Sequence, residues 1–256
     1  MNPRPKNVSA LLIAVSASAI CFGQAAAKTA LETKASGAKQ FYVDDQAGSN
    51  QMSFSSQSTI EDFTGVCNKV RGECTVDPKD LESFKGKFSI RVADMRTGID
   101  LRDSHLRSGD WMDAEKHPEV VIDVTSIEDA KKTAANTATM TLVGTCAFHG
   151  KSNAIKIPAK FTYLDESPKT QQKVKGDLIV LRTEFKVKLS DYGVAGPKGA
   201  ETIGLKVSDD IEIKATVFGS TQPPPKGLEA DKPVGKPAGT PAAGTQPSKP
   251  APPKRP

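Results

Sequence analysis

A period-two alternation of apolar and polar residues, repeated in segments between residues 88 and 217, constrains the fold of this chain more than any other feature. In each segment this spacing places the apolar side chains on one side of an extended strand and the polar side chains on the other. Turn-rich stretches separate the segments, an arrangement typical of an antiparallel sandwich or barrel. We therefore predict an all-β domain in which Lys156, Lys186 and Lys188 lie on the solvated outer face.

Helix is predicted in two places only. Asp77 is a candidate N-cap and Pro78 a candidate first helical residue for one or two turns over residues 79–84. Residues 101–116 leave room for a second short helix. Neither segment is long enough to organise the fold.

Residues 1–27 have the three parts of a secretory signal peptide. Arg4 and Lys6 precede an apolar run over residues 10–22, and residues 25–27 are three alanines that form a small-residue cleavage site. The run has about 13 residues, whereas a membrane-spanning helix needs about 20. We expect cleavage after this segment and a periplasmic or secreted mature chain that is not transmembrane.

Residues 221–256 hold 11 of the 18 prolines and almost no aliphatic residues. Such a segment cannot bury enough apolar surface to offset its chain entropy, so we predict a disordered Pro/Lys-rich tail. A spacer and an attachment to an anionic surface or partner are both open roles for it. Between the signal peptide and this tail we expect a polar lead-in over residues 28–40 and one folded domain over residues 41–220.

The positive charge of the chain does not belong to the predicted domain. The net charge of the chain is +5, of which the tail supplies +4 and the first 27 residues +2, so residues 28–220 are near −1. A domain of this charge gives no support for nucleic-acid binding.

A motif in the middle of the chain identifies a family resemblance. An Arg-Asp-x-His-Leu step at residues 102–106 is followed by an aromatic-x-Asp-x-x-x-x-Pro step at residues 111–118. In this order and spacing the chain resembles the YceI-like polyisoprenoid-binding family, over about residues 41–219. Further agreement lies at Gly65-Val66, Val70-Arg71-Gly72, Gly144, His149-Gly150, residues 185–193 and residues 209–213.

The resemblance implies a lipocalin-like, eight-stranded antiparallel β-barrel that holds a polyisoprenoid lipid, quinone-like or polyprenyl, in a long internal channel. A barrel of about eight strands either packs solid or holds one small ligand, so an ordinary packed core remains an alternative. Strand alternation selects the apolar residues that would line the channel: Phe88, Ile90, Val92, Ile122, Ile155, Ile157, Phe161, Phe185, Val187, Ile211, Ile213 and Val217.

Four residues in the segments that match the family pattern are candidates for the mouth of the channel. There they would contact a ligand headgroup or fix a connection between strands. They are Arg102, His105, Trp111 and His149. The three histidines of the chain, at positions 105, 117 and 149, have no recognised metal-ligand spacing. We therefore predict no metal site.

The mature chain keeps an odd number of cysteines in a compartment where disulfides persist. Cys67 and Cys74 are the candidate disulfide pair, and Cys146 is expected in a strand as a small apolar residue. The pairing needs a turn between its two members, because residues 67 and 74 of one extended strand would stand about 23 Å apart.

These features predict a binding protein that holds an isoprenoid lipid or quinone and needs no catalytic cofactor. We predict no enzymatic activity, because the chain has neither a Gly-x-Ser-x-Gly elbow nor a His-Glu-x-x-His helix. Two alternatives are an accessory protein that presents isoprenoid quinone to a membrane cytochrome, and a non-catalytic envelope stress or structural protein. The sequence does not fix the ligand headgroup or the oligomeric state.

Overall fold

The structure is a computed structural model that describes residues 28–44, 50–198 and 202–224. The predicted signal peptide and all but the first residues of the predicted tail lie outside these ranges. The strands are β1 (Lys39–Val43), β2 (Gln51–Gln57), β3 (Asp62–Cys67), β4 (Arg71–Asp77), β5 (Asp80–Arg91), β6 (Glu119–Ala134), β7 (Thr137–Phe148), β8 (Lys151–Leu164), β9 (Leu178–Lys188) and β10 (Asp210–Ser220). The helices are α1 (Asp100–Arg107) and α2 (Pro168–Gln171), with 3-10 turns η1 (Val92–Asp94) and η2 (Ser190–Tyr192).

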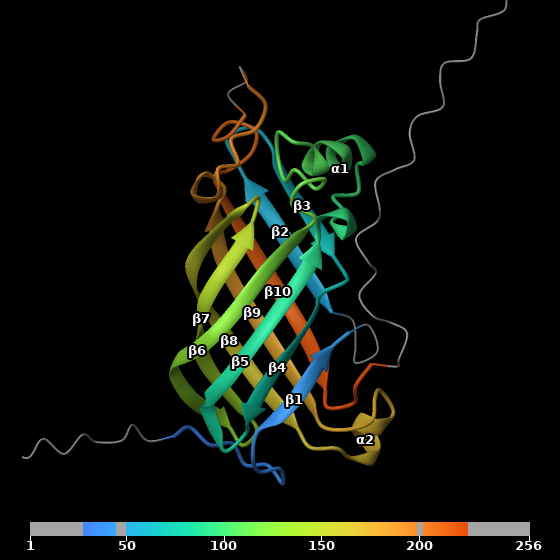
Figure 1. Cartoon of the computed structure of the whole chain (residues 1–256), viewed down its shortest axis with the longest axis vertical. Coiled ribbons are helices and arrows are strands. Elements are labelled where there is room, and N and C mark those ends of the chain that lie inside the picture. Colours follow the sequence, from blue (N-terminus) through green and yellow to red (C-terminus); the bar gives the residue numbers. More distant parts are fainter. Residues whose placement is uncertain (1–27, 45–49, 199–201, 225–256) are drawn as a thin grey trace, which may run out of the picture.

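The strands form one antiparallel sheet that closes on itself. Its order is β1-β4-β5-β6-β7-β8-β9-β10-β2-β3, with a further pairing between β1 and β10. Both β1 and β2 pair with β10, at Tyr42 opposite Ser220 and at Gln51 opposite Thr216, so they follow one another along a single edge. Figure 1 shows the resulting barrel, with α1 at one end and α2 at the other.

Counted by their positions around the barrel, the strands occupy eight places. β4 pairs with β1 and β3 pairs with β2, so β3 and β4 also follow one another along one line and are interrupted only at residues 68–70. The predicted eight-stranded antiparallel barrel with short helices is therefore confirmed. The alternating apolar residues fall on strands β5, β6, β8, β9 and β10 as predicted, because period-two patterning forces one side of each strand into the interior.

One predicted helix is wrong and the other is shorter than predicted. Residues 80–84 belong to β5, because Pro78 and Lys79 form the tight connection of a β4–β5 hairpin rather than a helical first turn. The side chain of Asp77 accepts a hydrogen bond from the Lys79 amide at 2.8 Å, which is a turn contact, not a helix cap. The second helix is α1, which occupies eight residues.

The half of the barrel beside α2 is packed solid. Phe41 meets Tyr163 edge to face with ring centroids 5.8 Å apart, and Phe84 meets Phe161 in the same way at 6.1 Å. The predicted polar lead-in contributes to this closed end. Its Leu31 is buried, donates its amide to Pro78 and so ties the lead-in across the barrel. We call this half, sealed by aromatic side chains and the lead-in, the closed end.

A charged cluster ties several segments together at the closed end. Asp177 accepts hydrogen bonds from Lys39 Nζ and from the Tyr163 hydroxyl, both at 2.7 Å, and from the Glu166 amide at 2.8 Å. Burial raises the pKa of Asp177, but the hydrogen bonds from Lys39 and Tyr163 outweigh it and hold the pKa below its ordinary value. Asp177 therefore stabilises the fold in its ionised form.

Replacing Asp177 with alanine should destabilise the barrel by about 2–3 kcal/mol, because Lys39 and Tyr163 lose a charged partner. A carboxyl with a lowered folded-state pKa contributes stability above its unfolded pKa of about 3.9, and that contribution is lost as the pH falls through the folded value. Urea unfolding at pH 7 and pH 3 should therefore show a smaller difference for Asp177→Ala than for the unchanged chain. As a control, the free energy of unfolding of the exposed-site variant Asp123→Ala should differ from that of the unchanged chain by less than about 0.5 kcal/mol.

The predicted disulfide between Cys67 and Cys74 is wrong, since Cys67, Cys74 and Cys146 are all free and buried. Cys67 ends β3 and Cys74 lies within β4, which continues along the line of β3. No turn brings the two together, and seven positions of extended chain far exceed the Cα separation of about 4.4–6.8 Å that a disulfide spans. Burial raises the pKa of all three thiols, which lowers their reactivity.

A thiol reagent such as Ellman's reagent should therefore react with none of these three cysteines in the native protein and with all three in urea, without prior reduction. The reason is that thiolate formation and reagent access both require exposure. If fewer than three thiols react in urea and all three react only after reduction, the protein contains a disulfide after all.

Candidate ligand-binding site

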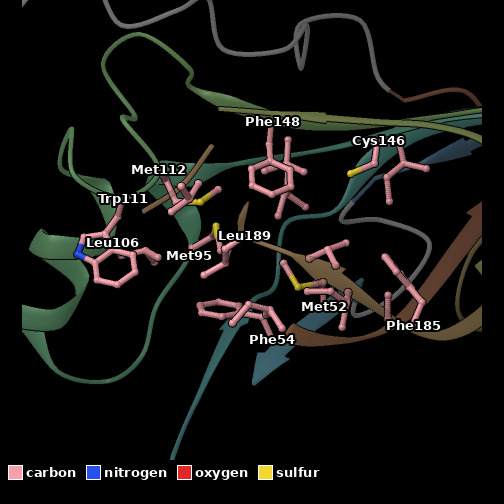
Figure 2. A pocket seen from close by; sticks show the side chains of 18 of the residues that line it. Met52, Phe54, Met95, Leu106, Trp111, Met112, Cys146, Phe148, Phe185 and Leu189 are labelled. Atoms are coloured by element: carbon pink, nitrogen blue, oxygen red, sulfur yellow. The ribbon is translucent and has the colours of Figure 1, made fainter. Parts of the chain in front are cut away.

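The half of the barrel beside α1 encloses a cavity of about 320 Å³, within the range of small-molecule sites. Its wall comes from residues of β2, β3 and β5 to β10, from the segment that carries α1, and from the connections at residues 70, 189–194 and 202–207. In Figure 2 the labelled side chains of Met52, Phe54, Phe148 and Phe185 surround a common space. Because these groups are apolar, the cavity suits a ligand part that has no hydrogen-bonding groups of its own.

Most of the residues predicted to line a channel do line this cavity. Those that do are Phe88, Ile90, Ile122, Ile157, Phe185, Val187, Ile211, Ile213 and Val217. The other three, Val92, Ile155 and Phe161, do not. The cavity is thus confined to one half of the barrel, whereas the resemblance implied a long channel.

Two of the three exceptions, Val92 and Phe161, have a clear structural reason. Val92 lies in η1, where β5 has ended and the period-two alternation no longer holds, and its amide donates to Pro118. Ile155 is half-buried against the core two positions before Ile157 on β8, and its contacts do not explain why Ile157 lines the cavity and Ile155 does not. Phe161 belongs to the closed end, where it is fully buried against Phe84.

Several lining residues were not predicted because they lie in short or irregular segments. Met95 and Met112 flank α1, in connections that have no strand periodicity. Met52 and Phe54 lie on β2, and their spacing of two was a usable signal that the many serines of this strand obscured. The ring of Phe54 lies over Gly65 on the neighbouring strand, where an added Cβ would be 2.1 Å from the ring. A residue with a side chain at position 65 would push Phe54 into the cavity.

The cavity opens between three segments at the α1 end, which together we call the mouth: residues 58–61, residues 99–106 and residues 202–207. The exposed residues Glu61, His105 and Lys206 belong to its lining. Arg102 also lines the cavity, forms an ion pair with Glu61 and places its guanidinium 5.1 Å from the centre of the Phe63 ring. Arg102 and His105 therefore lie at the mouth, where they were predicted.

Two contacts hold the segment around α1 in place over the cavity. The buried carboxylate of Asp103 accepts hydrogen bonds from the amide and hydroxyl of Thr97, at 2.6 and 2.7 Å. Burial raises the pKa of Asp103, but these hydrogen bonds outweigh that effect and lower it. Trp111 lines the cavity and lies against Gly196, whose φ of 73° and close approach leave little room for a side chain.

His149 does not line the cavity, unlike the other three predicted mouth residues. It lies in the β7–β8 connection with a φ of 49°, and its Nδ1 is 3.0 Å from the carbonyl oxygen of Tyr192. Its ring centroid is 5.6 Å from that of His117. His149 thus ties η2 to the β7–β8 connection. Among the described residues no group of three or more His, Cys, Asp or Glu side chains is placed to hold a metal.

In the described ranges no helix has the length and apolar character needed to cross a membrane. The longest of them, α1, has eight residues.

Comparisons with known proteins match this fold. A family model for the YceI-like domain matches residues 41–218. A UPF0312 protein of Pseudomonas aeruginosa is 25% identical over 158 residues, which are 62% of this chain and 74% of the relative. A UPF0312 protein of Staphylococcus aureus is 24% identical over 140 residues, 55% of this chain and 74% of the relative.

Two solved structures share the fold at low sequence identity. BcnA of Burkholderia cenocepacia is 18% identical with a TM-score of 0.53, covering 66% of this chain and 95% of BcnA. A polyisoprenoid binding domain from Saccharophagus degradans is 12% identical with a TM-score of 0.52, covering 72% of this chain and 99% of that domain. With the family model matched over nearly the whole described barrel, the chain belongs to the family of proteins with a YceI-like domain.

Proposed function

We propose that this protein binds the apolar tail of an isoprenoid lipid in the cavity of its barrel and carries or sequesters that lipid in the periplasm or outside the cell. The observation that carries the proposal is the cavity itself, whose wall is almost entirely apolar and which opens at a mouth that holds polar groups. An amphipathic ligand fits this arrangement, with its tail inside and its headgroup at Arg102, His105 and Lys206.

Transfer of isoprenoid surface out of water supplies the binding free energy, at about 25 cal/mol per Å² before the costs of association. The likeness to a polyisoprenoid binding domain and the YceI-like family support an isoprenoid over other apolar ligands. Presentation of a bound quinone to a membrane cytochrome remains a prediction from the sequence. Binding rather than catalysis fits a wall that places few polar groups near a ligand tail.

Trp111 gives a direct measurement of this binding, because it is the single tryptophan of the chain and lines the cavity. Titration of the delipidated mature protein with a short-chain ubiquinone should quench its fluorescence to saturation at one equivalent. An isoprenoid alcohol of four units should compete and restore the fluorescence.

Extraction of the protein purified from its own envelope, followed by mass spectrometry, identifies the natural ligand. Unsaturable quenching together with no bound lipid in the purified protein would contradict the proposed function.

A further inference from the structure

Four large apolar side chains are exposed in the part of the chain that the structure describes, and all four lie at the mouth. Ile60 is 62% exposed in the β2–β3 turn, and Leu205 is 39% exposed in the loop before β10. Ile99 and Leu101, at the start of α1, are 49% and 67% exposed. Single exposed apolar residues are ordinary on a protein surface, but their collection at one end of the barrel is not.

Contacts between the segments that carry these residues join them at one end of the barrel, and we call the four residues the apolar rim: Ile60, Ile99, Leu101 and Leu205. The Ile60 amide donates to the Leu205 carbonyl at 3.1 Å, and the ion pair of Arg102 with Glu61 joins α1 to the β2–β3 turn. Three rim residues are each followed directly in the sequence by a residue that lines the cavity, namely Glu61, Arg102 and Lys206. The rim therefore borders the opening itself.

The charges of the rim segments do not form a basic patch. The exposed acidic side chains of the three mouth segments, Glu61 and Asp100, equal the basic side chains Arg102 and Lys206 in number, and Arg102 is paired with Glu61. A partner held by this surface is therefore recognised through apolar contact, because an anionic partner would meet no excess of positive charge.

We infer that the apolar rim inserts into the surface of a lipid bilayer and places the cavity mouth against it, so that a ligand tail passes between bilayer and barrel without crossing water. The inference rests on the proposed function, since a water-insoluble lipid resides in a bilayer and the barrel has to contact that bilayer to take it up. The closed end is filled by Phe41, Tyr163, Phe84 and Phe161, so the rim borders the end through which the ligand has to pass. Apolar side chains that penetrate the interface hold a protein there without a spanning segment.

The test uses the full mature chain and flotation with vesicles of pure phosphatidylcholine, a neutral lipid that does not attract the basic tail. The unchanged protein should float with these vesicles equally at 0.1 M and 0.5 M NaCl, because burial of apolar surface is not screened by salt. The double variant Ile60→Ser/Leu101→Gln should reduce the vesicle-bound to free ratio at least about tenfold, as should Leu205→Ser combined with Ile99→Ser. The matched variant Val143→Thr, on the outer wall of β7, should bind like the unchanged protein.

Quenching of Trp111 by a short-chain ubiquinone in detergent reports cavity binding separately from docking. The rim variants should keep this quenching while they transfer a fluorescent isoprenoid lipid to vesicles more slowly. Two results would contradict docking through the rim while leaving the proposed function intact. In both of them the quenching is normal; in one the unchanged protein does not float, and in the other the rim variants float as well as the unchanged protein.

Flotation that requires anionic lipid and is lost in 0.5 M NaCl would show that the basic tail, rather than the rim, binds the vesicles. A rim-dependent dimer in light scattering, without flotation, would assign the rim to a second copy of the chain.

Discussion

An Ala215→Phe variant should lose its affinity for the ligand at least about a hundredfold while its fold remains as stable as before. Ala215 lines the cavity from β10 and lies directly opposite Thr183, another small lining residue, on β9. A phenyl ring at position 215 occupies the space that a ligand tail needs, and the resulting overlap costs about 3 kcal/mol, which is a factor of about one hundred in affinity.

The stability of this variant separates a blocked site from a damaged fold. An inserted ring fills empty space in the ligand-free protein and gains contacts there, so its free energy of unfolding should change by less than about 1 kcal/mol. The matched variant Thr216→Phe places the same ring on the outer face of the same strand and should bind ligand normally. Isothermal titration of both variants with one isoprenoid alcohol, beside their urea unfolding curves, makes the comparison. Unchanged affinity in Ala215→Phe would show that the ligand is held outside the cavity.

The sequence predicted the part of this fold that obeys one periodicity. Wherever a strand keeps its alternation, the side of each residue follows from its position, so lining residues such as Ile122, Phe185 and Ile213 could be assigned correctly to the interior. Alternation does not indicate, however, how far along the barrel axis a residue lies. Phe161 and Ile157 share one face of β8, yet one is packed in the closed end and the other lines the cavity.

Contacts between irregular segments could not be predicted, since they follow from how the strands curve around the barrel. Met95, Met112 and Trp111 reach the cavity from connections without periodicity, and only Trp111 was a candidate. The position of Cys74 shows the same limit. The predicted pairing of Cys67 and Cys74 needed a turn between them, whereas the pairing of β1 and β2 along one edge of β10 makes β3 and β4 successive parts of one line. That arrangement depends on residues far away in the sequence.

The floor of the cavity should set the length of tail that the barrel accepts, and Phe161 is the residue that tests it. Phe161 is fully buried and is the cross-strand neighbour of Leu181, which lines the cavity. Phe161→Ala should destabilise the ligand-free protein by about 3–5 kcal/mol, because it removes a buried ring and leaves a void. The void extends the apolar space below the cavity, so the affinity for a longer isoprenoid alcohol should rise about tenfold relative to a shorter one.

The Phe41→Ala variant distinguishes an extended cavity from a loosened fold. Phe41 is equally buried but packs on Tyr163, and it does not line the cavity. Its loss should cost a similar free energy of unfolding without changing the preference for tail length. A ligand stabilises the state that it binds. Addition of a long isoprenoid alcohol should therefore raise the melting temperature of Phe161→Ala more than addition of a short one does. The comparison uses alcohols of two, three, four and eight isoprene units with both variants. Equal recovery by all lengths in Phe161→Ala would show that the tail ends above this residue and that the closed end does not limit its length.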